Sequence, residues 1–379
     1  MEFLDTLWTY AVPFVVILTI VIFVHELGHY LIARWNGVKI DVFSIGFGHE
    51  IVGWTDAKGT RWKIGWIPLG GYVKFFGDES AASDPGRGLG AMNEAERAVS
   101  FHHKRLGQRA AVVVAGPAAN FLFAIVVYAA MFMTFGQAFS PPVVDTVMPD
   151  SAASTAGLKP GDRFVAVDGS SVSRFAEVQQ IVRMNPGRPL RMAIERDGQN
   201  VPLTITPKST RVTDNFGRTR DVGILGVTRA GQVEYVRYDP VTSVGLAVLE
   251  SWRIVALTMS YLGEVIVGER SGEDIGGPIG IARMSGEAAQ VSFAAALSFV
   301  AVLSVSLGLI NLFPIPLLDG GHLLFYAFEA VRGKPLGERS QEYGFRIGLA
   351  VVVSLMLYAT WNDLSSIPFV VNLVNTLFS

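Results

Sequence analysis

Two histidines and a glutamate form the first group of residues in this sequence that could do chemistry. They are His25, Glu26 and His29, in the pattern His-Glu-Leu-Gly-His. On a helix, residues four positions apart share a face, so the imidazoles of His25 and His29 can bind one Zn²⁺ at about 2.0–2.1 Å. Glu26 lies about 100° further round the helix, where its carboxylate can act as a general base rather than as a ligand. The alternative is a polar helix end with hydrated histidines, which would be costly beside an apolar span.

A catalytic zinc ion needs a third protein ligand, and the sequence points to Asp319. The chain has no cysteine, so this ligand must be a histidine or a carboxylate. Asp319 lies near the end of the segment 311–321, Asn-Leu-Phe-Pro-Ile-Pro-Leu-Leu-Asp-Gly-Gly, which follows an apolar run. Pro314 and Pro316 are expected to end a helix there, which frees backbone groups and redirects the chain. A carboxylate at that depth needs a cation, and zinc would supply one.

The four remaining histidines are weaker candidates for the metal. His49, His102 and His103 lie between the first two apolar stretches of the chain. His102 and His103 belong to a basic segment, where solvated side chains are the simpler interpretation. His322 follows Asp319 by three residues and is expected to be a polar neighbour of the site.

Four apolar stretches are predicted to carry these residues across a membrane. Half of the sequence is hydrophobic and only 17% is charged, against about 25% in an ordinary soluble domain. A spanning helix needs about 20 apolar residues. The predicted spans are 6–24, 110–135, 288–318 and 347–362. A cleaved signal peptide is the alternative for the first stretch, but acidic residues precede it and no small-residue cleavage site follows.

Basic residues cluster at those ends of the predicted spans that would lie on the same side of the membrane. They are Arg34 and Lys39 after the first span, residues 104–109 before the second, and residues 332–346 between the third and the fourth. Basic loops face the cytoplasm. We therefore expect both termini and residues 136–287 outside, and the chemistry towards the cytoplasmic side.

Residues 241–268 leave the number of spans open between four and five. This stretch is apolar, but Glu250, Arg253 and Glu264 interrupt it. A span here would also place the basic loops on opposite sides of the membrane. We therefore expect an amphipathic helix that lies on the external surface of the bilayer.

Residues 40–78 predict a β-hairpin rather than a further span. Two β-rich, glycine-punctuated runs are joined by the polar turn 56–59, Asp-Ala-Lys-Gly. The hairpin is unusually apolar and aromatic, so it is expected to associate with the membrane. It can enter the bilayer only where its backbone is covered or paired.

Residues 141–208 have the composition of a soluble domain and resemble a PDZ domain. The run 156–169, Ala-Gly-Leu-Lys-Pro-Gly-Asp-Arg-Phe-Val-Ala-Val-Asp-Gly, is the most specific part of this resemblance. A helix is predicted over 175–185, followed by a hairpin across residues 197–198. PDZ domains bind an extended peptide along an exposed strand edge, so a peptide carboxyl terminus is an expected partner. The alternative is a steric cap over the site.

The predicted fold is a polytopic α-helical membrane protein with four transmembrane helices, a membrane-associated β-hairpin and one external α+β PDZ-like domain. Its predicted segments are the first transmembrane helix (1–35), the cytoplasmic-side loop with the hairpin (36–107), the second transmembrane helix (108–138), the PDZ-like domain (139–235), an external interfacial helix and linker (236–287), the third transmembrane helix (288–330), a cytoplasmic loop (331–346) and the fourth transmembrane helix with a C-terminal tail (347–379). Distant segments must therefore meet to complete a zinc site.

Together these motifs resemble the intramembrane site-2 proteases, and most closely the bacterial regulator of sigma-E protease group. The resemblance covers nearly the whole chain. It rests on His-Glu-Leu-Gly-His, the hairpin run Ile-Pro-Leu-Gly-Gly-Tyr-Val-Lys-Phe, Ala-Gly-Pro-Ala-Ala-Asn-Phe, the PDZ-like region, Gly-Gly-Pro-Ile-Gly-Ile-Ala, and Asn-Leu-Phe-Pro-Ile-Pro-Leu-Leu-Asp-Gly-Gly. The first and last motifs are highly specific in combination.

The resemblance implies a zinc endopeptidase and assigns roles to individual residues. His25, His29 and Asp319 would bind the Zn²⁺, Glu26 would be the catalytic acid and base, and Asn311 would hydrogen-bond the substrate backbone. The hairpin would pair with an unwound substrate segment. The hairpin glycines expected at that contact are Gly46, Gly48, Gly70 and Gly71. The implied substrate is a single-span membrane protein, namely an anti-sigma factor already trimmed outside, with remnant signal peptides as the alternative.

Three further motifs carry more modest expectations. Better-known members of the group have two PDZ modules and this chain has room for one, which puts a two-domain size filter in doubt. Gly116, Pro117 and Asn120 are predicted to pack against a neighbouring helix, with Asn120 in an interhelical hydrogen bond. Residues 276–280 are predicted to form a turn that anchors the external helix.

Two other classes of function are less consistent with the sequence. A membrane-anchored PDZ adaptor without catalysis would not need the intact zinc motif, and zinc quantification separates it from an enzyme. A transporter would need ionisable residues within several spans, and the predicted second and third spans contain none. The net charge of −2 argues against a nucleic-acid partner.

Overall fold

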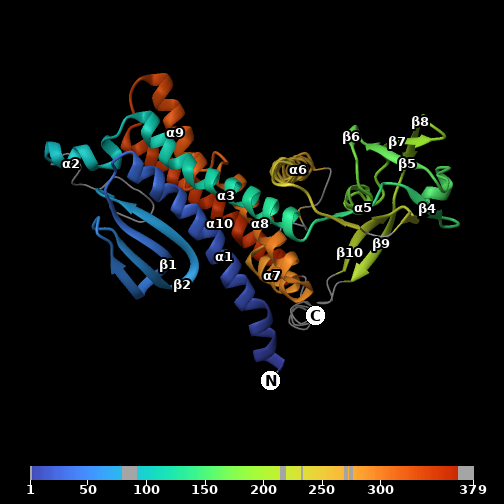
Figure 1. The fold of residues 1–379 in the computed structure, drawn as a ribbon. Helices are drawn as coiled ribbons and strands as arrows, with labels where there is room; N and C mark the ends of the chain where they lie inside the picture. The colour runs from blue at the N-terminus through green and yellow to red at the C-terminus, as the bar shows by residue number, and fades with distance from the viewer. Residues whose placement is uncertain are drawn as a thin grey trace, which may run out of the picture. The chain divides into compact units, whose positions relative to one another are not determined.

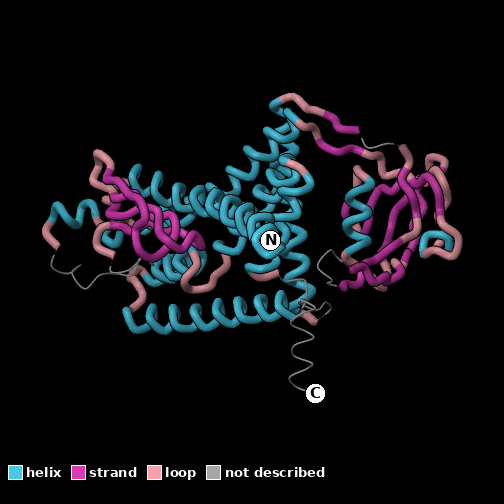
Figure 2. The backbone as a smooth tube through the Cα atoms, turned by 90° about the horizontal axis from the view of Figure 1, so that it is seen from below, coloured by secondary structure: helices cyan, strands magenta, loops and turns pink. Residues whose placement is uncertain are grey.

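The computed structural model describes residues 2–78, 92–213, 219–231, 234–268, 272 and 276–365 (Figure 1). The chain forms two compact units, which we describe separately. The first is a helical unit formed by residues 1–133 and 239–363, and it also carries the hairpin. The second, here called the inserted domain, is built on residues 134–238. Strands are confined to the hairpin and the inserted domain in the described part of the chain (Figure 2).

The helical unit contains helices long and apolar enough to cross a membrane. Its helices are α1 (Glu2–Trp35), α2 (Glu94–Val99), the 3₁₀ turn η2 (Phe101–His103), α3 (Leu106–Thr134), α6 (Pro240–Ile266), α7 (Pro278–Val291), α8 (Phe293–Asn311), α9 (Asp319–Arg332) and α10 (Glu338–Ser365). Among the described residues, five of these qualify as spans by length and composition: α1, α3, α6, α8 and α10. The helix beyond the four predicted spans is α6, which covers the stretch predicted to lie on the membrane surface. The count of four spans therefore stays a prediction.

The predicted third span is divided in the structure. The stretch 288–318 was expected to be one apolar run, but α7 ends at Val291 and α8 starts after Ser292. The Ser292 hydroxyl accepts a hydrogen bond from the Ala295 amide at 3.0 Å, which caps the new helix. After α8 the chain breaks over residues 312–318, because the two prolines there offer no backbone N–H to continue a helix. Leu317 takes a φ of 91° in this break, an uncommon conformation for a bulky residue.

Helices α1 and α3 touch through small residues beside the zinc motif. A methyl group at Gly28, within His-Glu-Leu-Gly-His, would overlap the Ala115 carbonyl and lie 2.7 Å from Ala119 Cβ. Such small-residue contacts let helix backbones approach closely in a membrane. Away from this contact, Ile17 and Val21 of α1 and Val300 of α8 form a buried apolar cluster. The helix with the histidines is therefore held tightly by α3 and α8.

The hairpin of β1 (Ile40–Thr55) and β2 (Arg61–Phe75) is folded back on itself, unlike the simple hairpin predicted. Residues 52–55 pair with 64–61 as in any hairpin. Residues 42–45 pair with 74–71 on one side and with 61–64 on the other. The two strands thus form a four-segment sheet, in which residues 71–75 are an edge. The sequence pattern gives strand type and turn, but not a second fold of the ribbon.

Glycines make this second fold possible. Gly46 has a φ of 84°, and a methyl group on it would come within 2.7 Å of the Ile67 carbonyl. A methyl group on Gly65 would be 2.6 Å from the Phe47 carbonyl, so the strands touch at their bends. Such bends need residues without a Cβ. Trp54 and Trp66 remain exposed on the sheet, as expected for a surface that meets lipid.

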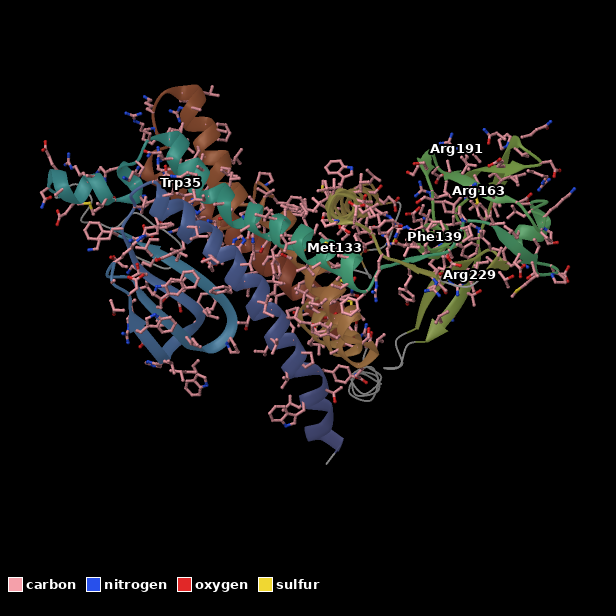
Figure 3. The ribbon with its side chains drawn as sticks, in the orientation of Figure 1. Trp35, Met133, Phe139, Arg163, Arg191 and Arg229 are labelled. Carbon is pink, nitrogen blue, oxygen red and sulfur yellow. The ribbon has the colours of Figure 1, made fainter. Side chains whose placement is uncertain are left out.

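The inserted domain is a small α+β unit with its own core. Its main sheet has the order β6-β5-β7-β8, with a β9–β10 hairpin and the helix α5. Its elements are β3 (Gln137–Phe139), β4 (Val144–Val147), α4 (Ala152–Thr155), β5 (Arg163–Val167), β6 (Ser170–Ser171), α5 (Phe175–Arg183), β7 (Leu190–Arg196), β8 (Gln199–Ile205), β9 (Lys208–Thr213), β10 (Thr219–Ile224), β11 (Val227–Arg229) and β12 (Glu234–Val236). Phe164, Leu190 and Ile194 are buried at its centre. Arg163 and Arg191 are exposed on β5 and β7, as in a water-facing domain (Figure 3).

Candidate metal centre

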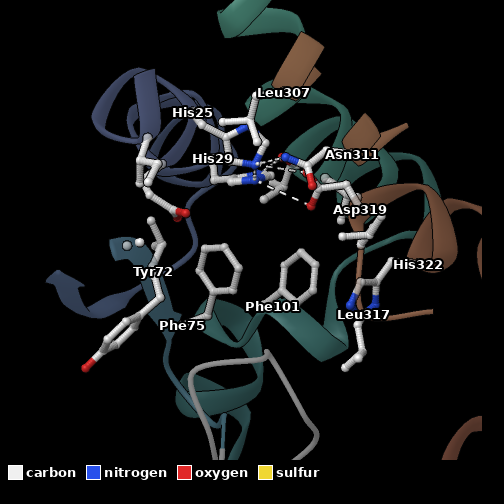
Figure 4. A pocket seen from close by; sticks show the side chains of 18 residues that line it. His25, His29, Tyr72, Phe75, Phe101, Leu307, Asn311, Leu317, Asp319 and His322 are labelled. Carbon is white, nitrogen blue, oxygen red and sulfur yellow. Dashed lines mark hydrogen bonds and ion pairs between the residues drawn. The ribbon is translucent and has the colours of Figure 1, made fainter. Parts of the chain in front are cut away.

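The side chains of His25, His29 and Asp319 converge on one point (Figure 4). His25 Nε2 lies 3.2 Å from His29 Nε2 and 3.1 Å from Asp319 Oδ2. His29 Nε2 lies 3.5 Å from Asp319 Oδ1. The first helix of the chain and the start of α9 thus meet here, as the proposed ligand set requires. All three side chains are at most 16% exposed.

These three side chains fit a zinc ion. Three atoms that each lie about 2.0–2.1 Å from one tetrahedral zinc are separated by about 3.3–3.4 Å. The two imidazole nitrogens are 3.2 Å apart, and each lies 3.1 or 3.5 Å from one of the two Asp319 oxygens, which is close to that value. Among the described residues, Asp319 Oδ2 is a buried oxygen without a hydrogen bond, although His25 Nε2 is only 3.1 Å away. Such closeness without hydrogen-bond geometry is expected of two ligands that share an ion.

Asp319 is positioned by the break before α9 and by the docking of α9. It is the first residue of that helix. A methyl group on Gly321 would come within 2.5 Å of the Ile315 carbonyl oxygen and of Pro316 Cα. The chain can therefore turn into α9 only if residue 321 has no side chain. Further along α9, Glu329 pairs with Arg109 of α3. The two side chains are about 15% exposed, and a partly buried pair of this kind is expensive to break.

His29 is oriented by the backbone of α3. Its Nδ1 lies 2.8 Å from the Val112 carbonyl oxygen. A carbonyl can only accept, so Nδ1 carries the proton and Nε2 is left to bind a metal. Gly116, one turn further along α3, lies directly against the imidazoles. A methyl group there would overlap the His29 ring and stand 2.9 Å from His25 Cε1.

His25 is oriented by Asn120, whose part in the site the sequence analysis missed. The Asn120 amide lies 3.2 Å from His25 Nδ1 and is completely buried. Gly116 was predicted to pack against a neighbouring helix and Asn120 to form an interhelical hydrogen bond, and the contact between Asn120 of α3 and His25 of α1 confirms that bond. That its partner is a proposed zinc ligand was not predicted. No local spacing pointed to this partner, because it depends on how α1 crosses α3.

Glu26 lies beside the ligands on the wall of a cavity of about 290 Å³. Val73, on the edge segment of β2, lines the same cavity. The cavity is lined by catalytic candidates, by the edge segment of β2 and by apolar side chains: Ile22, His25, Glu26, His29, Gly70, Gly71, Tyr72, Val73, Phe75, Phe101, Val112, Val113, Leu307, Asn311, Leu317, Leu318, Asp319 and His322. The arrangement brings a candidate metal site, a carboxylate and strand backbone to one cavity.

The residues predicted to contact substrate are placed in two groups. Asn311 lines the cavity, with its amide 3.5 Å from His25 Nε2. Gly70 and Gly71 also line it. Gly46 and Gly48 do not, because they lie at the bend of β1, where Gly46 serves the second fold of the sheet. A substrate contact for all of them stays a prediction.

The other histidines take structural or peripheral positions. His102 pairs with the buried carboxylate of Asp78 at 2.8 Å. That carboxylate also accepts a hydrogen bond from the Phe75 amide at 2.9 Å and so fixes the end of the edge segment. His103 lies 3.1 Å from the Ser100 hydroxyl. His322 lines the cavity one turn beyond Asp319.

Comparison with known proteins gives a consistent result over nearly the whole chain. The family model of peptidase family M50 matches residues 13–355. A relative in Agrobacterium fabrum, provisionally named a zinc metalloprotease, is 47% identical over 362 residues, which cover 94% of this chain and 96% of that protein. The metalloprotease MmpA of Caulobacter vibrioides is 40% identical over 372 residues, or 92% of this chain and 94% of that protein.

Solved structures resemble only a part of the chain. The PDZ domain of an SdrC-like protein from Listeria monocytogenes is 19% identical, with a TM-score of 0.19, and covers 25% of this chain and 92% of that domain. The corresponding domain from Listeria innocua is 20% identical, with a TM-score of 0.20, and covers 24% of this chain and 96% of that domain.

Proposed function

The chain belongs to peptidase family M50, and from that premise we propose that its zinc centre hydrolyses a peptide bond in or near the transmembrane segment of single-span membrane proteins. The family makes it a zinc metalloprotease with several membrane-type helices. The proposal of cleavage in or near a transmembrane segment rests on which residues line the cavity. Its wall joins His25, His29 and Asp319 to the edge segment of a β-sheet in an apolar setting.

The proposed chemistry divides between the ion and one carboxylate. A bound zinc ion acts as a Lewis acid that polarises a carbonyl and lowers the pKa of water. His25, His29 and Asp319 would hold this ion. Glu26 takes a proton from the attacking water and passes it to the leaving amine nitrogen. Glu26 lines the cavity together with the three proposed ligands, so its carboxylate can reach a water molecule bound there.

The substrate must enter as an extended strand. In a helix each carbonyl is already hydrogen-bonded, and opening the helix in an apolar setting leaves backbone groups without partners. The edge segment 71–75 can supply those partners by β-augmentation. Its residues Gly71, Tyr72 and Val73 line the cavity next to Glu26. Asn311, at the opposite wall, is suited to donate to the substrate backbone.

We further propose a place in the cell and a substrate class. Basic residues near the ends of α1, α3 and α9 support a zinc centre on the cytoplasmic side of a bacterial inner membrane. The inserted domain and both termini then face the periplasm. An anti-sigma factor whose external part has been removed fits a site of this depth. Remnant signal peptides are the alternative substrate of the same chemistry.

The inserted domain offers a cavity of about 340 Å³ for a peptide end. It lies between α5 and β10 and has mostly apolar walls, including Val178, Val182 and Ile224. Arg183, a basic side chain in this lining, suits a terminal carboxylate. We propose that this cavity binds an apolar peptide carboxyl terminus. Titration with peptides that differ only in a free or amidated carboxyl terminus should show tighter binding of the free form.

The decisive experiment replaces the proposed base. Glu26→Gln should abolish proteolysis while zinc content stays near one ion per chain, because the ligands are unchanged. Quantitative proteomics of the membrane fraction should then show single-span proteins accumulating as forms trimmed outside the membrane. Glu94→Gln, on the exposed surface of α2, is the matched control and should leave the proteome as in the wild type.

The outcome separates the alternatives. Accumulation of short signal peptides instead of single-span proteins would favour the remnant-clearing role. Unchanged cleavage in Glu26→Gln would contradict the assignment of the base. A catalytically inactive adaptor is not consistent with family membership and an assembled ligand set, and it predicts no accumulation at all.

A further inference from the structure

We infer that Asn120 is a positioning residue for the zinc centre, whose amide oxygen accepts the Nδ1 proton of His25 and so holds Nε2 ready to bind the metal. The inference concerns only the metal centre, and it does not depend on which substrate the enzyme cleaves. Asn120 lies on α3, outside the ligand motifs of α1 and α9.

The chemistry of a zinc-bound imidazole requires such a partner. The nitrogen that binds the ion carries no proton, so a neutral imidazole keeps its proton on the other nitrogen. For His29 the arrangement is already visible, because Nδ1 faces the Val112 carbonyl oxygen at 2.8 Å and an oxygen there can only accept. His25 has the same requirement, and the group at its Nδ1 is the Asn120 amide, 3.2 Å away.

The Asn120 amide can offer an acceptor to the Nδ1 proton of His25 if it rotates by a half turn about its Cβ–Cγ bond. Asn120 Nδ2 is the atom nearest to Nδ1, and Oδ1 is buried without a hydrogen bond among the described residues. Exchanging the two atoms puts an acceptor on the Nδ1 proton. When Nε2 is committed to zinc, Nδ1 carries the proton and would otherwise face the Nδ2 donor, so the exchange replaces two opposed donors by a hydrogen bond.

The position of Asn120 leaves its amide little else to do. The residue is 0% exposed, and its backbone carbonyl accepts a hydrogen bond from Ser304 Oγ at 2.9 Å. That bond connects α3 to α8 through the backbone and does not involve the amide. The packing role predicted from sequence is thus carried by the backbone of Asn120, and the side chain is directed at His25.

Two substitutions in the full-length protein distinguish the inference from a purely structural role. Asn120→Leu keeps the volume and removes the acceptor, and should weaken zinc binding about 10- to 100-fold. Asn120→Asp offers only acceptor oxygens, and should bind zinc within about threefold of the wild type or more tightly. Zinc affinity is measured by competition with a chromophoric chelator on detergent-purified protein, without any substrate.

Ser304→Ala is the matched control, since it removes the hydrogen bond to the backbone of Asn120 and leaves the amide in place. It should bind zinc within about threefold of the wild type. The inference is overturned if Asn120→Leu binds as the wild type does, or if Asn120→Asp is as weak as Asn120→Leu. Should Asn120→Leu fail to fold by size-exclusion chromatography, Asn120→Asp against the wild type decides alone. Loss of zinc from the wild type itself would instead contradict the metal centre on which the proposed function rests.

Discussion

At the scale of single residues, the metal centre depends on a position that has no side chain. Gly116 of α3 lies against both imidazoles, and a methyl group there would overlap the His29 ring. The imidazoles cannot retreat, because Val112 holds the Nδ1 of His29 and Asn120 faces that of His25. Cores packed to this density cannot take an added carbon without displacing a neighbour.

Gly116→Ala should therefore displace the histidines and lower zinc occupancy at least tenfold at limiting zinc. Elemental analysis of the purified protein measures the bound metal. Gly107→Ala is the control on the same helix, because a methyl group at Gly107 meets no atom within 4 Å. Equal zinc content in the two variants would show that the contact at Gly116 is not required.

The residue scale also shows where prediction from sequence succeeds. His25, Glu26 and His29 are neighbours on one helix, so their common geometry follows from helical spacing alone. The positions of Asn120 and Val112 relative to them depend on how α1 crosses α3. No spacing within α3 carries that information. From the sequence, Asn120 is therefore predicted only to contact a neighbouring helix, and the arrangement of α1 and α3 is needed to identify His25 as its partner.

At the scale of elements, the folded-back hairpin is closed by one carboxylate. Asp56, in the turn, accepts hydrogen bonds at 2.9 Å from the amides of Lys58 and Thr60. Its other oxygen accepts from Trp62 Nε1 at 3.1 Å and from the Tyr30 hydroxyl of α1 at 3.2 Å. Desolvation raises the pKa of Asp56, but these four donors outweigh it and lower the pKa to about 2. The turn is thereby attached to α1 as well as to β2.

This shift predicts acid sensitivity of the hairpin. Since the folded-state pKa lies below the ordinary value of about 3.9, ionised Asp56 stabilises the turn above about pH 4. The stabilisation falls as the pH decreases from about 4 to about 2. Hydrogen exchange in residues 56–62, corrected for the intrinsic rate, should accelerate over that range in the wild type and stay flat in Asp56→Asn. Equal acceleration in both would assign the effect to another group.

A second carboxylate connects elements of the helical unit. The predicted turn at 276–280 forms the start of α7, where the Gly280 amide donates to Asp363 Oδ2 of α10 at 2.9 Å. A methyl group at Gly277 would lie 2.7 Å from the same oxygen. A carboxylate at a helix N-terminus is favourable. The glycines of this motif thus admit a cap from a helix that lies more than 80 residues away in sequence.

At the scale of the whole molecule, each of the two compact units has its own apolar packing and its own ion pair. The helical unit combines apolar clusters with close contacts of small residues and the Arg109–Glu329 pair. The inserted domain has an apolar core and a buried ion pair. There Asp162, 1% exposed, accepts bonds of 2.6 and 2.7 Å from Arg196. It also accepts from the Lys159 amide at 2.7 Å. Desolvation opposes ionisation, but these donors lower the pKa of Asp162.

Asp162→Asn should destabilise the inserted domain by about 1.5–3 kcal/mol, the usual loss for a hydrogen bond to a charged group. Limited proteolysis within 134–238 should accelerate, while the zinc content of the helical unit stays unchanged. Asp221→Asn is the control in the same domain, because its pair with Arg211 is largely exposed and such pairs contribute little. A parallel loss of zinc in Asp162→Asn would contradict independent stability of the two units.

The sequence by itself determined the chemistry and the kinds of element in this protein. The zinc motif, the carboxylate after two prolines, the apolar helices and the strand runs are local patterns, fixed by helical and strand periodicity and by the limits of proline and glycine. The tertiary structure alone decided which distant groups touch. It brought α3 against the histidines, doubled the hairpin so that 71–75 became an edge at the cavity, and divided the run 288–318 into α7 and α8. Those outcomes depend on the close packing of side chains from separate segments, which no periodicity within one segment encodes.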